Sequence, residues 1–401
     1  MEKMQVRVGA CAVSLCALLG GCDVSQDAEK LYSERTATFH VIVVDEYMVI
    51  GQHRVFNILQ TTGEDRDAGV NLDLGVLGEN VAEGGNGNDY IQAGDRLKVA
   101  IYGGPGDDEL VGSRDTDILV GDLGKDTLRA GLGSDLLVID EFDDFDGGPG
   151  EDRAVYGGMA DLDLNISDHN VEIFNSGGGD DFIRTNLEKE AAIHGGPGND
   201  RLYGGYGGDW LMGGKGRDVL EGGYGNDTYV YLRGDGRDTI NDFSFNRRTD
   251  TVYDIYSDGS RRNYRKREMR IKEHAGQDRI LFGKGISPRD LIIRFDGLDL
   301  LVALKDPKNY SAPFDEHSDQ IRLSNWEDLC DRLEYFEFQS GAVVDIGILV
   351  RVNGVSKKGS GFDMATLSSY KAYGFDKTAK PPACERSEEQ LSVREIDPPK
   401  D

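Results

Sequence analysis

A nine-residue period constrains the fold of this chain more than any other feature of its sequence. From Gly195 the chain reads GGPGNDRLY, GGYGGDWLM, GGKGRDVLE and GGYGNDTYV without a break. An earlier block over residues 103–138 reads GGPGDDELV, GSRDTDILV, GDLGKDTLR and AGLGSDLLV, in which several glycines are replaced. A tandem repeat of such short units indicates a solenoid, because each unit can bury its apolar face only by stacking on its neighbours.

Single units stand outside the two blocks, at residues 84–92, 147–155, 176–184 and 233–241. A longer duplication relates residues 72–89 to residues 162–181, which indicates that the solenoid grew by copying of units. Every unit has an aspartate at its sixth position, and these aspartates are Asp89, Asp108, Asp117, Asp126, Asp135, Asp152, Asp181, Asp200, Asp209, Asp218, Asp227 and Asp238.

Each unit divides into a six-residue turn, GGxGxD, and a three-residue strand with an apolar middle residue such as Leu110 or Leu202. Alternate side chains of a strand face opposite ways, so this residue points inwards and its neighbours point outwards. We therefore expect an all-β fold: a parallel β-roll over residues 84–242, in which the apolar residues form a continuous internal ladder.

The composition of the turn predicts a calcium site. Glycine allows the positive φ angles of a tight turn in which carbonyl oxygens converge. Carbonyl oxygens and an aspartate carboxylate make a hard, oxygen-only site that suits Ca²⁺ better than the smaller, more rigidly hydrated Mg²⁺. In the regular block the glycines expected to line such sites are Gly196, Gly198, Gly205, Gly207, Gly214, Gly216, Gly223 and Gly225.

With two units per coil, each turn stacks on the turn 18 residues later. The pairs expected to share an ion are Asp108 with Asp126, Asp117 with Asp135, Asp200 with Asp218, and Asp209 with Asp227, and Asp218 also faces Asp238. This arrangement predicts on the order of four to six ions. Turns that have lost glycines, around Asp115 and Asp122, are expected to hold weaker or empty sites.

The tandem GGxGxDxLx units resemble the RTX family of haemolysin-type calcium-binding repeats. That resemblance implies a parallel β-roll with Ca²⁺ between its turns. The charge of the chain supplies a mechanism, since 45 Lys and Arg stand against 73 Asp and Glu. Without metal the stacked carboxylates repel one another, and calcium removes the repulsion, so we expect binding and folding to be one event.

The first 21 residues have the composition of an export signal. Lys3 and Arg7 precede an uncharged apolar run over residues 8–19, which is too short for a stable membrane span. The run ends in Leu-Gly-Gly before Cys22, and this sequence resembles the lipobox of bacterial lipoproteins. The resemblance implies that Cys22 is a lipid anchor on an exported protein of the cell envelope or cell surface. An ordinary cleaved signal of an extracellular protein and a mis-assigned start codon remain as alternatives.

The flanking segments predict four further parts. Residues 22–83 form a linker, with a cap or a degenerate repeat near residues 36–61. Residues 243–277 form an insertion whose stretch 261–272 is rich in Arg and Lys, either a patch for anionic lipid or polysaccharide or a solvated loop or helix. Residues 278–350 alternate like strands, with turns at Asp296-Gly297 and Ser340-Gly341, and would cover the open end of the roll. Residues 351–401 form a disordered tail.

The sequence indicates a binding protein more than an enzyme. It contains no HExxH and no GxSxG motif, so zinc protease and serine hydrolase sites are not predicted. Its formal charge of -28 argues against nucleic acid as a partner. We expect a structural, adhesive or calcium-capturing role at the cell surface, with calcium, the membrane and surface polysaccharide or protein as partners. The alternative is a calcium-dependent enzyme or enzyme subunit acting on extracellular polysaccharide, which a groove of Tyr203, Tyr206, Trp210 and Tyr224 would favour over simple strand packing.

Overall fold

The fold was analysed in a computed structural model. The structure describes residues 41–44, 47–50, 53–55, 58–60, 69–77, 80–94, 98–242, 244–255, 261–273, 276–326, 333–352 and 360–366. The export signal, Cys22 and residues 367–401 lie outside the described residues.

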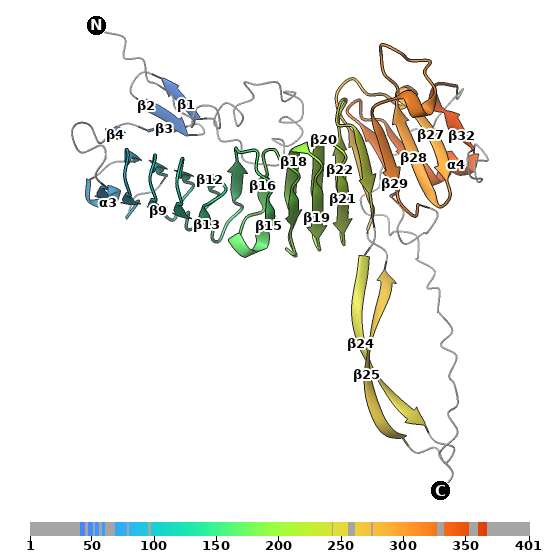
Figure 1. Ribbon diagram of the computed structural model, residues 1–401, viewed down its shortest axis with the longest axis horizontal. Helices are drawn as coiled ribbons and strands as arrows, with labels where there is room; N and C mark the ends of the chain where they lie inside the picture. The colour runs from blue at the N-terminus through green and yellow to red at the C-terminus, as the bar shows by residue number, and fades with distance from the viewer. Residues whose placement is uncertain are drawn as a thin grey trace.

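The chain forms a roll of stacked coils, each with one strand on either side, as the nine-residue period predicts (Figure 1). One side is a single thirteen-stranded sheet, parallel from its first strand to β30. Its strands in spatial order are β4 (Ile58–Gln60), β6 (Val81–Glu83), β8 (Ala100–Tyr102), β10 (Ile118–Val120), β12 (Leu136–Ile139), β14 (Arg153–Tyr156), β16 (Ile173–Asn175), β18 (Ala192–Gly198), β20 (Trp210–Gly216), β22 (Thr228–Tyr231), β26 (Arg279–Phe282), β30 (Tyr335–Phe338) and β31 (Val343–Asp345).

The opposite side of the roll is divided into two sheets. The five-stranded sheet contains β5 (Asn71–Asp73), β7 (Tyr90–Gln92), β9 (Glu109–Val111), β11 (Thr127–Arg129) and β13 (Asp144–Asp146). The nine-stranded sheet contains β15 (Asp163–Asn165), β17 (Phe182–Arg184), β19 (Arg201–Gly205), β21 (Val219–Gly223), β23 (Arg237–Ile240), β29 (Gln320–Leu323), β28 (Asp299–Leu304), β27 (Leu291–Asp296) and β32 (Gly361–Asp363). Each duplicated segment carries a short helical turn: α3 (Leu74–Leu77) follows β5, and the 3₁₀ turn η1 (Ile166–His169) follows β15.

The interior of the roll is the predicted apolar ladder. The middle residue of each strand pairs with its counterpart one coil away, as Leu119 does with Leu137 and Leu202 with Leu220. These residues are at most 2% exposed along the whole ladder: Leu110, Leu119, Leu128, Leu137, Leu202, Leu211, Leu220 and Tyr229. Three-residue strands have too few hydrogen bonds to be stable alone, so this shared core holds the coils together.

The C-terminal segment continues both sides of the roll and closes its end. β26 and β30 extend the first sheet, β29 pairs in parallel with β23, and β28, β27 and β32 add antiparallel strands. Both predicted turns are confirmed, since Gly297 and Gly341 join antiparallel neighbours with φ of 73° and 80°. Short helical segments complete this part: η2 (Pro288–Asp290), η3 (Phe314–Glu316), α4 (Ile346–Val352) and η4 (Met364–Thr366).

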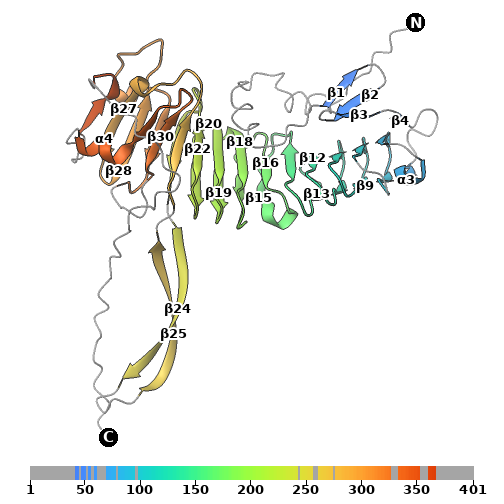
Figure 2. The same cartoon turned by 180° about the vertical axis from the view of Figure 1, so that it is seen from behind.

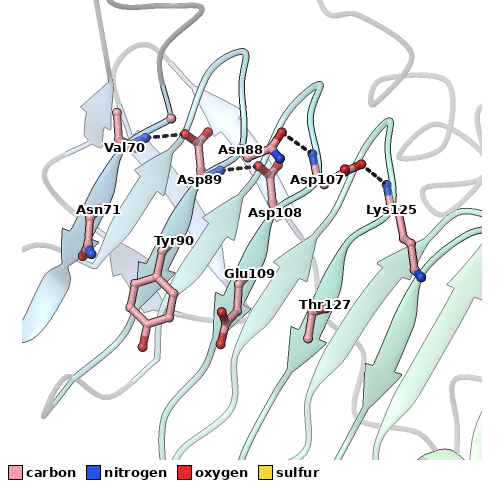
Figure 3. A pocket seen from close by; sticks show the side chains of 11 residues that line it. Val70, Asn71, Asn88, Asp89, Tyr90, Asp107, Asp108, Glu109, Lys125 and Thr127 are labelled. Atoms are coloured by element: carbon pink, nitrogen blue, oxygen red, sulfur yellow. Dashed lines mark hydrogen bonds between the residues drawn. The ribbon is translucent and has the colours of Figure 1, made fainter.

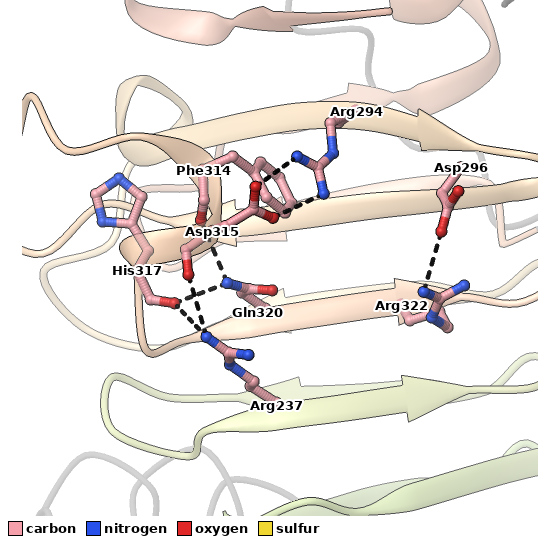
Figure 4. Close-up of polar contacts among 8 residues, drawn as sticks. All are labelled: Arg237, Arg294, Asp296, Phe314, Asp315, His317, Gln320 and Arg322. Carbon is pink, nitrogen blue, oxygen red and sulfur yellow. Dashed lines mark hydrogen bonds and ion pairs between the residues drawn. The ribbon is translucent and has the colours of Figure 1, made fainter. Parts of the chain in front are cut away.

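Polar contacts fasten the cap to the last coil (Figure 4). The guanidinium of Arg237 on β23 donates to the main-chain carbonyls of Asp315 and His317, at 3.3 and 3.5 Å. Asp315 also accepts two hydrogen bonds from Arg294 on β27, at 2.8 and 3.1 Å, and that guanidinium lies 4.3 Å from the ring centre of Phe314. The loop that carries η3 is therefore held from both the roll and the cap.

The insertion forms two long strands, β24 (Ser244–Ile255) and β25 (Arg261–Glu273), which pair antiparallel as a ribbon. The ribbon projects away from the roll in both views (Figures 1 and 2). The expected solvated loop or helix is therefore wrong for the described residues. At the other end of the molecule β1 (Val41–Val44), β2 (Tyr47–Ile50) and β3 (His53–Val55) form a small antiparallel sheet.

Three predicted boundaries differ from the structure. The roll begins before residue 84, because Val81 and Ala82 on β6 are buried in the shared core. The strand expected through residues 346–349 is the helix α4, whose buried Ile346, Leu349 and Val350 have helical spacing. Within the predicted tail, residues 360–366 belong to the cap, where Met364 is fully buried.

Within the part of the chain that the structure describes, no helix has the length and apolar character needed to cross a membrane.

Candidate metal centre

The sixth-position aspartates stack one above another along the edges of the roll. The backbone N–H of Asp89 donates to Oδ1 of Asp108 at 2.7 Å (Figure 3). The N–H of Asp108 in turn donates to Oδ1 of Asp126 at 2.8 Å. Val70 begins this series by donating its N–H to Asp89. Each carboxylate thus has one oxygen bound to the coil before it, which fixes the side chain in the turn.

The same hydrogen bond repeats in four series, which we call carboxylate ladders. The first and third precede strands of the divided side of the roll, and the second and fourth precede strands of the thirteen-stranded sheet. In order, the ladders are Asp89, Asp108, Asp126 and Asp143; Asp117, Asp135, Asp152 and Glu172; Asp181, Asp200, Asp218 and Asp238; and Asp209, Asp227, Asp278 and Glu334.

The structure brings all the predicted pairs together. Asp108 with Asp126, Asp117 with Asp135, Asp200 with Asp218, and Asp209 with Asp227 are neighbours in a ladder, each 18 residues apart, and Asp218 also neighbours Asp238.

The second oxygen of most of these carboxylates is buried and accepts no hydrogen bond. A buried polar atom without a partner is rare in proteins, and a whole series of them indicates that a ligand supplies the missing contact. The Oδ2 atoms in this state belong to Asp89, Asp108, Asp126, Asp135, Asp152, Asp181, Asp200, Asp209, Asp218 and Asp227.

In the units that begin with glycine, these oxygens lie against that first glycine. A Cβ built on Gly195 would overlap Oδ2 of Asp200 and lie 2.7 Å from the carbonyl oxygen of Gly213, one coil later. Gly84 has the same surroundings from Asp89 and the Gly103 carbonyl. The space beside these two glycines is therefore bounded by a carboxylate oxygen and a main-chain carbonyl, and such donors fit a hard cation of the Ca²⁺ class.

The second- and fourth-position glycines, which the sequence predicted to line the sites, lie against the neighbouring coil and not against the unpartnered oxygens. Gly196 has φ of 98°, and a Cβ on it would overlap the carbonyl oxygen of Gly177 in the preceding coil. The other second- and fourth-position glycines also have positive φ, except Gly207. They allow close stacking of coils, whereas the first glycines Gly195, Gly204, Gly213 and Gly222, which the sequence did not single out, lie against the unpartnered oxygens.

Two of the predicted aspartates differ from the rest. Asp117 belongs to a unit in which Ser113 replaces the second glycine, and the main-chain N–H of Ser113 donates to Oδ2 while its hydroxyl donates to Oδ1 at 3.1 Å. Neither oxygen of Asp117 is left without a partner, so this turn supplies its own contacts. Asp238 likewise is absent from the series of unpartnered oxygens.

Burial and like charge act together on these groups. Desolvation, helped by the neighbouring charges of Asp218 and Asp181 and opposed by one backbone hydrogen bond, raises the pKa of Asp200 to about 8. Desolvation likewise raises the pKa of Asp135 to about 8. Such shifts mean that the fold places negative charge where water cannot stabilise it, and a bound cation would remove that penalty.

Four ladder members were not predicted from the sequence: Asp143, Glu172, Asp278 and Glu334. Asp278 had a readable signal, because Gly276-Gln277-Asp278-Arg279-Ile280 repeats the second half of a unit. Glu172 and Glu334 substitute the longer carboxylic acid, and Asp143 is shifted by one residue, so the spacing alone did not identify them.

The fifth position of the unit forms an outer series of hydrogen bonds. Oδ1 of Asn88 accepts from the N–H of Asp107, and Oδ1 of Asp107 accepts from the N–H of Lys125, both at 3.0 Å (Figure 3). These residues line an open pocket over the first ladder together with Tyr90 and Thr127. Because they satisfy main-chain donors, they hold the turns in register.

The four aromatic residues do not form one groove. Tyr203 lies on β19 and contacts Phe182 edge-on at 5.4 Å, whereas Trp210 lies on β20 in the other sheet. Tyr206 and Tyr224 stack at 5.5 Å in the turns. These four residues therefore give no support to the alternative of an enzyme acting on polysaccharide.

The family model of the RTX calcium-binding nonapeptide repeat matches the chain in four copies, at residues 74–95, 102–137, 192–220 and 203–240. No curated protein matches the chain.

Proposed function

The chain carries RTX calcium-binding nonapeptide repeats, and on that premise we propose that its four carboxylate ladders bind calcium and that the roll becomes compact when they do. The observation that carries the proposal is the series of buried Oδ2 atoms without hydrogen bonds, several of which lie beside a first glycine and a main-chain carbonyl of the next coil. These atoms would hold the ion, and the ion would supply the positive charge that the turns lack.

The coupling to folding follows from the position of the ladders. Each site lies between two coils, so an ion bound there links two units that are separated in the sequence. These units lie side by side only when the coils are stacked. The free energy of calcium binding is gained only in the stacked state, so it adds directly to the free energy of folding. Calcium modules of the extracellular type bind at about 10⁻⁴–10⁻³ M, so the roll would be loose in a calcium-poor compartment and compact outside the cell.

Calcium titration of the metal-free chain at neutral pH, followed by far-UV circular dichroism, tests this proposal. We expect a cooperative gain of β-structure in the millimolar range or below, and a much weaker response to the same concentration of Mg²⁺. A spectrum that does not change with calcium or with a chelator would contradict it.

We propose further that the protein acts at the bacterial envelope, in a structural, adhesive or calcium-capturing role. The support is the export-signal composition of residues 1–21 and the Leu-Gly-Gly-Cys sequence ending at Cys22. Replacing Cys22 by Ser should move the protein from the membrane fraction to the soluble fraction of cells. Membrane association that persists in this variant would remove the lipid anchor.

The proposed surface role has a direct test. Envelope extract is passed over the immobilised full chain with calcium and with chelator, and we expect polysaccharide or protein to be retained only with calcium. Equal retention under both conditions would mean that the roll does not present the binding surface. A catalytic function is not proposed, because no observation in the described residues favours one.

A further inference from the structure

The inserted ribbon interrupts a single nonapeptide of the fourth ladder. Gly276 stacks on Gly225, Gln277 donates its N–H to Asn226 at 2.9 Å, and Ile280 pairs with Tyr229. Residues 276–281 are thus the fourth to ninth positions of a unit, with Asp278 as its sixth-position carboxylate. The beginning of that unit must lie before the ribbon.

Asp242 occupies the first position of the interrupted unit. β23 pairs with β21 through Thr239 with Val219 and Ile240 with Leu220, and the N–H of Asn241 donates to the carbonyl of Leu220 at 2.9 Å. Continuing this register places Asp242 level with Gly222, which is a first glycine. Where the regular coil has no side chain, this coil therefore carries a carboxylate.

The side chain of Asp242 enters the space that the first glycine leaves open elsewhere. Carboxylate oxygens of Asp227, Asp242 and Asp278 all lie within 4.8 Å of one another. A Ca²⁺ ion at 2.3–2.6 Å from each oxygen spans oxygen–oxygen separations up to about 5 Å, so one ion can reach all three carboxylates.

A second observation points to a ligand in the same place. Asp278 is fully buried, its Oδ1 accepts the N–H of Asp227, and its Oδ2 accepts no hydrogen bond. Oδ2 of Asp227 is also buried without a hydrogen bond, and it shares the space over Gly222 with the hydroxyl of Tyr229. That hydroxyl donates to Oδ1 of Asp242 at 2.9 Å and so orients the third carboxylate.

We propose that Asp227, Asp242 and Asp278 form a three-carboxylate calcium site that closes the base of the ribbon onto the last regular coils. The proposal rests on calcium binding by the fourth ladder, since Asp227 and Asp278 belong to it, and adds a ligand from outside the sixth positions. The ion would hold together the two ends of the insertion, residues 242 and 278, together with the first strand of the cap, β26. It would thus join roll, ribbon and cap at one point.

Crystals of the full chain grown with Tb³⁺ in place of Ca²⁺ test the site directly. We expect an anomalous difference peak in contact with all three carboxylates, in addition to peaks along the ladders. Peaks along the ladders with none at these three residues would overturn the inference and leave the proposed function intact. The absence of peaks along the ladders would instead reject the proposed function.

Replacing Asp242 by Asn gives a second test in solution. Asn retains an acceptor for the hydroxyl of Tyr229 and removes the charge. Calcium content after equilibrium dialysis should fall by one ion per chain relative to the native protein, with the far-UV spectrum in calcium unchanged. The matched control is Asp168→Asn, an exposed carboxylate on η1, which should leave the calcium content unchanged.

Should Asp242→Asn fail to fold, the Tb³⁺ positions in crystals of the native chain decide the inference. Unchanged calcium content in a folded Asp242→Asn variant would overturn the inference.

Discussion

The two oxygens of a typical ladder aspartate have different contacts. Oδ1 is bound to the main chain of the preceding coil and aligns the turns, whereas Oδ2 is buried beside the first glycine. Asp117 shows the difference by contrast, because Ser113 satisfies both of its oxygens. A sixth-position aspartate therefore does not always leave an oxygen for a ligand, because its own turn can supply both contacts.

This contrast gives a prediction for single aspartates. Asp200→Asn should weaken calcium binding at its ladder by about tenfold or more, because the charge of the ligand set largely sets affinity. Asp117→Asn should change calcium binding little. Calorimetric titration of both variants checks the prediction. An equal loss of calcium affinity in the two would show that the Oδ2 atom without a hydrogen bond is not the ligand.

Gly195 should tolerate no side chain. Gly195→Ala places a methyl group against Oδ2 of Asp200 and the Gly213 carbonyl, and we expect a loss of about 1–3 kcal/mol together with weaker calcium binding. Gly234→Ala is the comparison, since Gly234 has a positive φ of 93°, unlike Gly195, and no atom within 4 Å of the added carbon, so its loss reports backbone strain alone. Denaturant unfolding and calcium titration measure both, and calcium binding by Gly195→Ala as tight as in the native protein would contradict the prediction.

At the scale of the element, the ribbon is an insertion that leaves the register of the roll unchanged on either side. β22 pairs with β26 as regularly as β20 does with β22, although the ribbon lies between them in sequence. The nonapeptide tolerates the insertion because its strand residues, which bury the core, all follow the point of interruption.

Removing the ribbon should therefore preserve the fold. In a variant that joins residue 242 to residue 276 through a two-residue Gly-Lys link, the interrupted unit regains nine residues. We expect a calcium-induced transition in circular dichroism with the same spectrum per roll residue and a midpoint within about threefold of the native one. Loss of the transition would show that the ribbon is part of the folding unit.

At the scale of the molecule, proton and calcium binding oppose each other. Aspartates titrate near pH 3.9 in an unfolded chain, whereas burial raises the pKa of Asp108 to about 7 and of Asp135 and Asp200 to about 8 in the metal-free roll. Between these values the folded state binds more protons than the unfolded state, so the free energy of unfolding falls as pH rises.

The metal-free chain should thus keep β-structure near pH 4–5 and lose it by about pH 8, where calcium restores it. Apparent calcium affinity should be lower at pH 5 than at pH 8, because protons must be displaced. Far-UV spectra of the calcium-free chain across this range check the sign. A metal-free roll that becomes more stable as pH rises would be inconsistent with desolvated carboxylates.

Much of the site was predictable because each repeat unit contacts only its neighbours in the stack, so spacing along the sequence becomes spacing along the roll. The spacing of nine residues set the strands, the inward leucines, the stacked aspartate pairs and the resemblance to calcium-binding repeats. The spacing could not show which carboxylate oxygen binds the main chain and which is left without a partner. It also could not show which glycine lies beside that oxygen, since the first and second glycines both fit the pattern. The helix α4 was missed because a short apolar run does not distinguish strand from helix.

The sequence by itself determined the coil, since a short period with glycine turns and one apolar residue per strand can bury a core only by stacking. Tertiary structure alone decided which carboxylates come together across insertions. Asp227 and Asp278 are 51 residues apart, yet one donates its N–H to the other, and Asp242 joins them because its coil returns to the same edge of the roll. Contacts of that kind depend on where the chain re-enters the stack, which no local pattern specifies.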